Sequence, residues 1–468
     1  MAQASNNERE LASAPIGKLM VRLALPAVLA QFINVLYNVV DRIYIGHIPG
    51  TGALALTGVG VTMPIILLIS AFAAFAGMGG APLASIQLGA GNRERAERIL
   101  SNSFSMLLIL SVVLTIFFRA FSRPLLYAFG ASDNIIDYGL SYINLYVLGT
   151  VFVQLALGLN TFISAQGHAT TAMLSVLIGA VTNIVLDPIL IFVFNMGVPG
   201  AAVATVISQA CSAAWALRFL TSKKSSIRIR LSYMKLQPKI ALSILGLGVA
   251  PFIMQSTESL VTITLNSGLQ TYGGDLYVGS MTVMQSVMQS IMMPMQGISQ
   301  GVQPILSYNY GAGNYQRVRD TFKLLFKVTV ALTVICCLVV VLFPGMFGRI
   351  FTSDAELIAL VSRVMPIFFA GIWMFGCQLS CQCLFMGLGQ AKISLFLALL
   401  RKVILLVPLA ILLPMATGSV ISIFVAEPIA DIAASATSLL LFFLNYKRLL
   451  PVTEQEKQMA AARAAKKK

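Results

Sequence analysis

Two aspartates lie deep within apolar stretches of this chain, where a carboxylate is costly unless it faces a cavity or a partner. Asp41 follows Arg22 by nineteen residues, about 28 Å along a helix that rises 1.5 Å per residue. Asp187 follows Ala169, where another apolar stretch begins, by eighteen residues. We therefore expect the two carboxylates at similar depth, where together they could bind a proton or a hard cation.

The chain around Asp187 supplies further oxygen ligands. Asn183 precedes Asp187 by one helical turn, and Pro188 leaves one carbonyl of its helix without a donor. Asp187 and Thr205 each lie nine residues from Met196, so a helical hairpin that turns near Met196 brings Thr205 level with Asp187. Such oxygens suit Na⁺, or a proton shared between two carboxyls. The predicted cation site consists of Asp41, Asn183, Asp187, Ala201 and Thr205.

Polar side chains precede Asp41 on the same face of its helix. Asn34, Tyr37 and Asn38 lie seven, four and three residues before it, and these spacings share one helical stripe. We expect this stripe to line a substrate cavity beside the cation site. The alternative is that Asp41 is solvated near the membrane interface and pairs with Arg42.

The composition places the chain in a membrane. Of its 468 residues 57% are hydrophobic and 10% charged, whereas a soluble domain carries about a quarter charged residues. The first apolar stretch is too long for the core of a cleaved signal peptide. We expect an all-α integral membrane protein with twelve transmembrane helices, near residues 20–45, 53–79, 97–121, 135–164, 170–194, 199–220, 241–271, 277–302, 321–345, 356–386, 391–414 and 418–445.

The formal net charge of +15 is distributed unevenly across the predicted membrane. Of the 32 Lys and Arg, four lie on one side and three within spans, and the others lie on the opposite side. The positive-inside rule then predicts an inner-membrane protein with both termini in the cytoplasm. The basic side should face anionic lipid headgroups rather than nucleic acid. The four residues on the external side are Arg42, Arg119, Arg123 and Arg349.

The chain repeats itself at an offset of about 222 residues. Residues 82–95 read PLASIQLGAGNRER and residues 304–317 read PILSYNYGAGNYQR, with seven of the fourteen positions identical. GAGN lacks the Lys-Ser/Thr ending of a phosphate loop and is expected to be a turn that begins a helix. We predict two homologous six-helix lobes: an N-lobe (1–220), a cytoplasmic linker (221–240), a C-lobe (241–447) and a basic tail (448–468).

The second half carries a different set of charges. Glu258 follows Lys239 by nineteen residues and should lie level with the N-lobe acids, either attracting cationic substrates or serving as a buried structural acid. Glu427 and Asp431 are four residues apart and are expected to pair with a basic residue of the preceding helix, Arg401 or Lys402.

Met284 and Met288 belong to a methionine-rich stretch. Flexible methionines suit a cavity that binds varied apolar compounds, although methionine is also common facing lipid. Both are predicted to line the substrate cavity. The six cysteines all lie in apolar spans and are expected to be buried, inert thiols.

Three motifs resemble the multidrug and toxic-compound extrusion (MATE) family, and the helix-5 motif is similar to its MepA-like branch. They are YNVVDRIYIGH around Asp41, TNIVLDPILIF around Asp187 and GAAVAT ending at Thr205. The resemblance covers essentially the whole chain and implies twelve helices in two bundles that form a V. It also implies export of amphiphilic, often cationic compounds in exchange for H⁺ or Na⁺.

The resemblance assigns roles to particular positions. The five residues of the predicted cation site match the family's N-lobe site, and Tyr37, Tyr142 and Asn160 match polar residues that accompany it. Glu258 resembles the helix-7 glutamate of the NorM-like branch. The acid that this branch uses in helix 10 is missing from 364–386, so a complete C-lobe cation site is not expected.

These observations predict a monomeric multidrug efflux transporter with no cofactor besides its coupling ion, H⁺ or Na⁺. The alternative is a flippase for a lipid-linked saccharide, whose cavity should be strongly cationic to hold pyrophosphate. A membrane enzyme is disfavoured because H-E-x-x-H and G-x-S-x-G motifs are absent from the sequence. The coupling ion and the physiological substrate stay open.

Overall fold

The computed structural model describes residues 6–351 and 354–451, and every regular element within these ranges is helical. In this part of the chain ten helices are long and apolar enough to cross a bilayer, and a bent pair adds an eleventh span. The remaining predicted span, 277–302, lies within a continuous helix of 37 residues, α11, which contains many Met, Gln and Ser residues. The all-α membrane fold class is therefore confirmed.

The helices follow one another with short connections and with few residues outside helical structure. The first half contains α1 (Asn6–Ser13), α2 (Ile16–Gly46), α3 (Gly52–Gly60), α4 (Met63–Gly89), α5 (Arg93–Ala128), α6 (Ile136–Leu148), α7 (Thr150–Ala165), α8 (Ala169–Pro188), the π-helical segment η1 (Ile189–Val193) and α9 (Val198–Thr221). After the short turn η2 (Leu231–Tyr233), the second half contains α10 (Pro238–Gly273), α11 (Asp275–Gly311), α12 (Tyr315–Leu342), α13 (Pro344–Phe351), α14 (Ala355–Phe368), η3 (Phe369–Gly371), α15 (Ile372–Gly387), α16 (Ala391–Leu399), the π-helical segment η4 (Leu400–Leu406), α17 (Val407–Thr417) and α18 (Ile421–Leu449).

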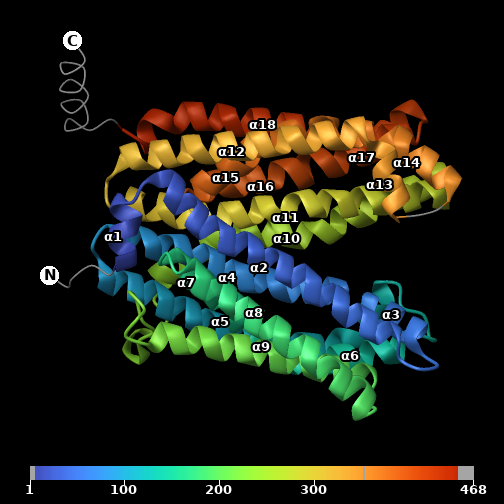
Figure 1. Cartoon of the computed structure of the whole chain (residues 1–468), viewed down its shortest axis with the longest axis horizontal. Helices are drawn as coiled ribbons and strands as arrows, with labels where there is room; N and C mark the ends of the chain where they lie inside the picture. The colour runs from blue at the N-terminus through green and yellow to red at the C-terminus, as the bar shows by residue number, and fades with distance from the viewer. Residues whose placement is uncertain (1–5, 352–353, 452–468) are drawn as a thin grey trace.

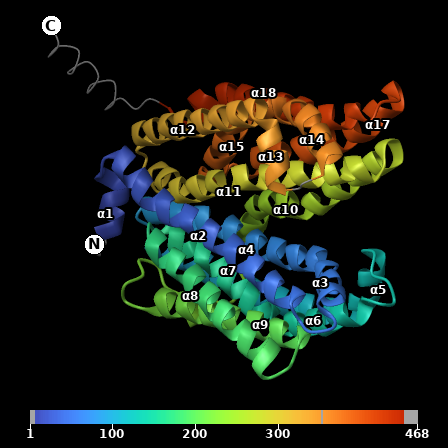
Figure 2. The same cartoon turned by 45° about the vertical axis from the view of Figure 1, so that its right-hand side comes forward.

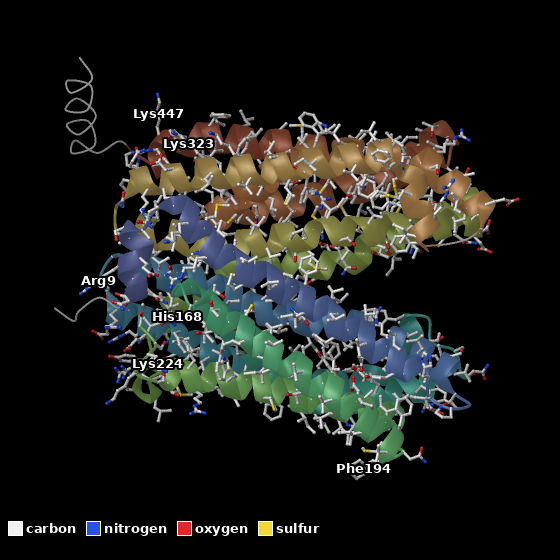
Figure 3. All side chains as sticks on the ribbon, viewed as in Figure 1. Arg9, His168, Phe194, Lys224, Lys323 and Lys447 are labelled. Atoms are coloured by element: carbon white, nitrogen blue, oxygen red, sulfur yellow. The ribbon has the colours of Figure 1, made fainter. Side chains whose placement is uncertain are left out.

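The helices form two bundles, α2–α9 and α10–α18, which meet at one end and diverge toward the other (Figure 1). The same separation is visible after a 45° turn (Figure 2). Figure 3 shows Arg9, Lys224, Lys323 and Lys447 at the end where the bundles meet and Phe194 at the opposite end. The basic end of the molecule is thus the closed end.

The two GAGN sequences form the same turn in both bundles. Gly91 and Gly313 end their helices at φ of +76° and +70°, a conformation that favours glycine. The side chains of Asn92 and Asn314 then cap the next helix by accepting the backbone N–H of Arg95 and Arg317, at 3.1 and 3.3 Å. The expected glycine turn is confirmed, and its repetition matches the sequence repeat.

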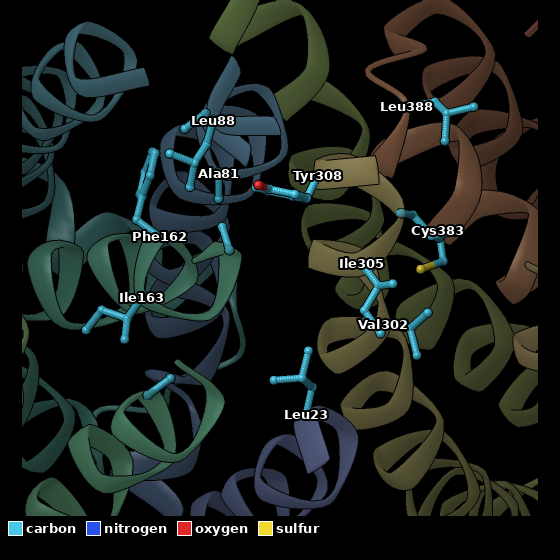
Figure 4. Packing of buried hydrophobic residues seen from close by; sticks show 14 of the residues in the cluster. Leu23, Ala81, Leu88, Phe162, Ile163, Val302, Ile305, Tyr308, Cys383 and Leu388 are labelled. Atoms are coloured by element: carbon cyan, nitrogen blue, oxygen red, sulfur yellow. The ribbon is translucent and has the colours of Figure 1, made fainter. Parts of the chain in front are cut away.

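Packing differs along the length of the molecule. At the closed end a single hydrophobic cluster joins residues of both bundles, among them Leu23 and Leu88 with Val302 and Ile305 (Figure 4). Farther out each bundle has a separate cluster of its own. The two bundles therefore share a hydrophobic core at one end, and each has its own core at the other end.

Glycines let the two bundles touch at the closed end. A Cβ on Gly89 would lie 1.9 Å from the carbonyl oxygen of Tyr308, and one on Gly311 would lie 1.8 Å from that of Ile86. No side chain fits at such distances, so only glycine permits this approach of α4 and α11. The first glycine of each GAGN motif thus has a packing role between the lobes.

Helix α1 lies across the closed end and bonds to both bundles. Asn7 contacts the Nδ1 atom of His168 at 3.0 Å, on the N-lobe side. Arg317 donates to the carbonyl of Leu11 at 3.0 Å, on the C-lobe side, and the Leu11 side chain is buried. Burial lowers the pKa of His168, which keeps this ring neutral near pH 7.

One predicted span is bent. The stretch 135–164 was expected as a single helix, but α6 and α7 meet at 59° on either side of Gly149. The Val206 side chain of α9 lies 2.5 Å from where a Cβ on Gly149 would stand, so the bend lies at a position where α9 leaves room only for glycine.

The segment 221–240 packs against the N-lobe through hydrogen bonds and an ion pair. The hydroxyl of Ser225 donates to Gln166 at 2.9 Å, and Arg230 pairs with Glu97 at 3.1 Å. Most of the predicted tail, 452–468, lies outside the described residues.

Candidate cation and substrate site

The two candidate acids come from helices that lie side by side, α2 and α8. Asp41 lies in the last two turns of α2, and Asp187 is the next-to-last residue of α8. At Pro188 the missing N–H interrupts the α-helical ladder, and the chain continues as the π-helical η1. The irregular turn beside Asp187 is thus a direct consequence of the proline.

Asn183, Asp187 and Thr205 are brought together as expected. The Nδ2 atom of Asn183 donates to Asp187 Oδ1 at 3.2 Å and contacts the Thr205 hydroxyl at 3.5 Å. Asn183 and Asp187 are fully buried. The Thr205 hydroxyl donates to the Ala201 carbonyl at 3.0 Å, so that carbonyl is already bonded to a side chain in this structure.

Asp41 and Asp187 face each other closely enough to share a hydrogen bond when one of them carries a proton. Asp41 Oδ1, Asp187 Oδ2 and Asn183 Oδ1 are all buried without a hydrogen-bond partner. An unsatisfied buried oxygen costs about 1–3 kcal/mol, and more when it is charged. Three such oxygens in one place are a site that a proton or a small hard cation would complete.

No ion pair to Asp41 or Asp187 occurs within the described ranges of the chain. Arg42, the neighbour expected to neutralise Asp41 in the alternative interpretation, directs its guanidinium to the sulfur of Met63 at 3.5 Å. Asp41 itself is only 9% exposed. The geometry therefore favours a paired acid site over a solvated, arginine-bound Asp41.

Aromatic rings border the acids on one side. Tyr142 is buried, its hydroxyl lies near that of Thr205, and its ring stacks on that of Tyr146 with centroids 6.1 Å apart. Tyr37 of α2 lies close to Asp41. Tyr146 was not predicted, although its spacing of four residues from Tyr142 places both rings on one helical face.

The other predicted cavity residues are spread more widely. Asn38 is exposed and donates to the Asn34 carbonyl at 2.6 Å, and Asn160 has a buried oxygen without a partner. Met284 is fully buried in the outer C-lobe cluster, and Met288 packs against that cluster. The structure thus places the two methionines in a packed core, apart from the acid pair.

The C-lobe acids are arranged differently, each beside a base. Arg401 donates to Asp431 at 2.6 Å and to Glu427 at 2.8 Å, which confirms the expected pairing of α18 with the preceding span. Lys402 pairs with Glu258. Both bases lie in η4, and the Arg401 guanidinium also lies over the Phe375 ring, 4.6 Å from its centroid.

Comparison with known proteins agrees with this architecture. The sequence model of the MatE family matches residues 26–189 and 251–412, one segment in each bundle. The chain belongs to the MatE family. Both matches end in the fifth span of a bundle, so this MatE protein repeats the family unit, as its internal repeat predicts.

Named relatives are similar over nearly the whole length of this MatE chain. The multidrug export protein MepA of Staphylococcus haemolyticus is 25% identical over 422 residues, covering 90% of this chain and 92% of that protein. MepA of Staphylococcus aureus is 23% identical over 443 residues, covering 94% and 96%. The resemblance to MepA-like members is thereby confirmed.

Solved structures share the fold. A crystal structure described as MATE in the bent conformation has a TM-score of 0.88 at 24% identity and covers 96% of this chain and 99% of that one. An outward-facing conformation of a multidrug resistance MATE family transporter has a TM-score of 0.86 at 23% identity, with the same coverage.

Proposed function

We propose that this MatE protein is a secondary active exporter of small organic compounds, driven by inward movement of H⁺ or Na⁺. The observation that carries the proposal is the buried Asp41–Asp187 pair, which has unpartnered oxygens and forms no ion pair with a base in the described part of the chain. Two carboxyls at such short distance cannot both ionise cheaply, so they hold a cation or a proton in common. Their occupancy then follows the cation gradient.

The substrates are proposed to be amphiphilic compounds of varied structure, in line with the name multidrug export protein that the relatives carry. The Tyr142–Tyr146 stack beside the acids offers an aromatic surface for an apolar body. The protein would act as a transporter rather than an enzyme, as a monomer surrounded by membrane lipid.

The orientation that we propose places the closed, basic end in the cytoplasm of an inner-membrane protein. Helix α1 and the end of α18 lie at this end, so both termini would be cytoplasmic (Figure 1). The bundles then diverge toward the outside, an outward-open arrangement. Cys introduced at Lys224 should resist an impermeant thiol reagent in intact cells, and Cys at Thr51 should react, in a cysteine-free background. The reverse pattern would invert the orientation.

Coupling is proposed to work through α2. This helix runs unbroken from Ile16 to Gly46 and contains Pro26, where the ladder lacks one hydrogen bond. A cation bound between Asp41 and Asp187 removes the excess negative charge near the outer end of α2, and α2 is then free to bend and reshape the cavity. Drug and cation would shift one equilibrium in opposite directions, as antiport requires.

Transport in inverted vesicles tests the function directly. Dye uptake should be driven by an acidic lumen, by luminal Na⁺, or by both, when ΔpH and ΔNa⁺ are imposed separately. The Asp187→Asn variant should abolish uptake under every gradient. Equal uptake by the variant and the wild type, at equal protein level, would remove the acid pair from the mechanism.

The flippase alternative gains no support from the charges. A pyrophosphate-binding cavity needs bases that are free to bind phosphate. In the part of the chain that the structure describes, the C-lobe bases Arg401 and Lys402 are both bound to carboxylates, and the N-lobe site is acidic.

A further inference from the structure

Two oxygens of α10 bind the ammonium of Lys402. Its ammonium pairs with the Glu258 carboxylate and donates to the Met254 carbonyl at 2.8 Å. The Lys402 side chain is 12% exposed, whereas that of Glu258 is 62% exposed. A carboxylate and a carbonyl one helical turn apart thus form a cradle, and Lys402 fills it from the opposite helix.

A small cavity of about 30 Å³ adjoins this cradle. Lys402, Arg401, Met254, Gln378 and Gln382 are among its lining residues. Gln378 and Gln382 are each 8% exposed, and the Oε1 atom of each is buried without a hydrogen-bond partner. These two amide oxygens add to the carboxylate and the carbonyl as hard ligands available at one spot.

The charges around the cradle favour a cation there. Arg401 is shared by Glu427 and Asp431, so this trio carries one negative charge in excess when all three groups are ionised. Glu258 adds a second negative charge, and Lys402 offsets one of the two. Without the ammonium, these three carboxylates and Arg401 would carry a net charge of −2 when all of them are ionised.

Two consecutive bases of the π-helical turn η4 contact different helices. Arg401 reaches the acids of α18, and Lys402 reaches Glu258 and Met254 of α10. Widened turns of this kind are frequent at functional sites.

We propose that Lys402 is an internal counter-cation: its ammonium occupies a C-lobe site for a primary amine or a small monovalent cation, and thereby excludes free ligands of this class. The site consists of the Glu258 carboxylate and the Met254 carbonyl, and Gln378 and Gln382 line the cavity beside it. Lys402 therefore determines specificity, since it confines free cations to the acid pair of the N-lobe. The inference stands on the C-lobe contacts and does not require that the protein exports drugs.

Chemical complementation tests this assignment. In a Lys402→Ala variant the vacated space should accept n-propylammonium, which reproduces the lost side chain. The Lys402→Ala change leaves the Glu258 carboxylate without its counter-ion, so binding of n-propylammonium should tighten at least tenfold relative to the wild type. Purified protein in detergent should then unfold at a higher temperature with n-propylammonium, because the ligand binds the folded state.

Matched controls separate this site from others. Neutral n-propanol, of the same size, should not stabilise Lys402→Ala. The Glu258→Gln/Lys402→Ala double variant should lose the n-propylammonium effect, and Asp187→Asn/Lys402→Ala should keep it. Lys402→Arg retains a tethered cation and should behave as the wild type does. Persistence of the effect in the Asp187→Asn background would also show that it does not depend on the proposed coupling site.

A second variant covers the case in which Lys402→Ala does not fold. Lys402→Met keeps the apolar stem and should bind one more Na⁺ per protein than the wild type, as measured by calorimetry. The proposal is overturned if neither variant gains an amine or Na⁺ site, or if the gained site survives Glu258→Gln.

Discussion

The two lobes share a repeated sequence, but the charges of their membrane-embedded acids are neutralised in different ways. In the N-lobe, Asp41 and Asp187 face each other, and neither forms an ion pair with a base of the described residues. In the C-lobe, Arg401 and Lys402 bind Glu427, Asp431 and Glu258. In each lobe the charged residues adjoin a π-helical segment, η1 or η4, in the fifth span.

This difference indicates which lobe can respond to an ion gradient. An acid pair without a base depends on protons or cations from solution, so its charge changes with their supply. An acid that already holds a lysine or arginine is neutralised by the protein itself. One half of the repeat is thus suited to exchange ions, and the other to hold its charge constant.

The largest expected effect is the loss of transport when the N-lobe acid is neutralised. Asp187→Asn should abolish gradient-driven dye uptake in inverted vesicles, because an amide cannot release a cation or proton in each cycle. Protein level and thermal stability should stay close to the wild type, since the change removes a buried carboxylate without breaking an ion pair. Glu94→Gln, at an exposed acid, is the matched control and should transport normally.

Removing a C-lobe base should instead damage stability. Arg401→Met leaves Glu427 and Asp431 buried without a counter-charge, which is expected to cost about 3–5 kcal/mol of unfolding free energy. Thermal unfolding of the purified protein measures this loss. Neutralising the acids as well, in Arg401→Met/Glu427→Gln/Asp431→Asn, should restore most of it. A single Arg401→Met variant as stable as the wild type would contradict the comparison.

Coupling between ion and drug should belong to the N-lobe alone. Raising Na⁺ or lowering pH should weaken drug binding to the purified protein by roughly 5- to 150-fold, a coupling of about 1–3 kcal/mol. Asp187→Asn should lose this dependence, whereas Glu427→Gln should keep it. Fluorescence titration of one dye at several ion concentrations is sufficient. Identical curves at all concentrations in the wild type would remove ion coupling from this site.

The smallest expected effect concerns the feature in which the lobes are alike. Gly79 and Gly301 are 222 residues apart, and a Cβ on either would lie 2.4 Å from the backbone of the opposite lobe. Gly79→Ala and Gly301→Ala should therefore each weaken the closed end by a similar amount, about 1 kcal/mol. Spin labels at Lys224 and Lys323 should show a larger share of long distances in both variants. A strong effect in only one of them would mean that the closed end is not symmetric.

Much of the acid site followed from helical spacing. Asn183 and Asp187 are one turn apart, and Thr205 lies at an equal distance beyond the hairpin turn, so their contact needed only regular helices. The glycine turns and the twofold repeat likewise followed from identical residues at one offset. The expected pairing of Glu427 and Asp431 with Arg401 followed from the high cost of unpaired charge in an apolar protein.

Other features depended on how helices pack against one another, which spacing within one helix does not express. The bend lies at Gly149, where Val206 of α9 occupies the space that a larger side chain would need. Met284 lies in a closed core, although its residue type equally suited a cavity. The pairing of Lys402 with Glu258 joins positions 144 residues apart, and only the packing of α10 against η4 selects it over the acids of α18.

The membrane class, the repeat, the depth of the acids and the local caps could be predicted from the sequence, because each depends on residue type and on periodicity along one helix. Which acids pair with a base depends on the tertiary structure, since the pairing is set by the distances between side chains on different helices. The joining of the lobes at the basic end also depends on it, because glycines on facing helices permit backbone contact there that any larger side chain would prevent.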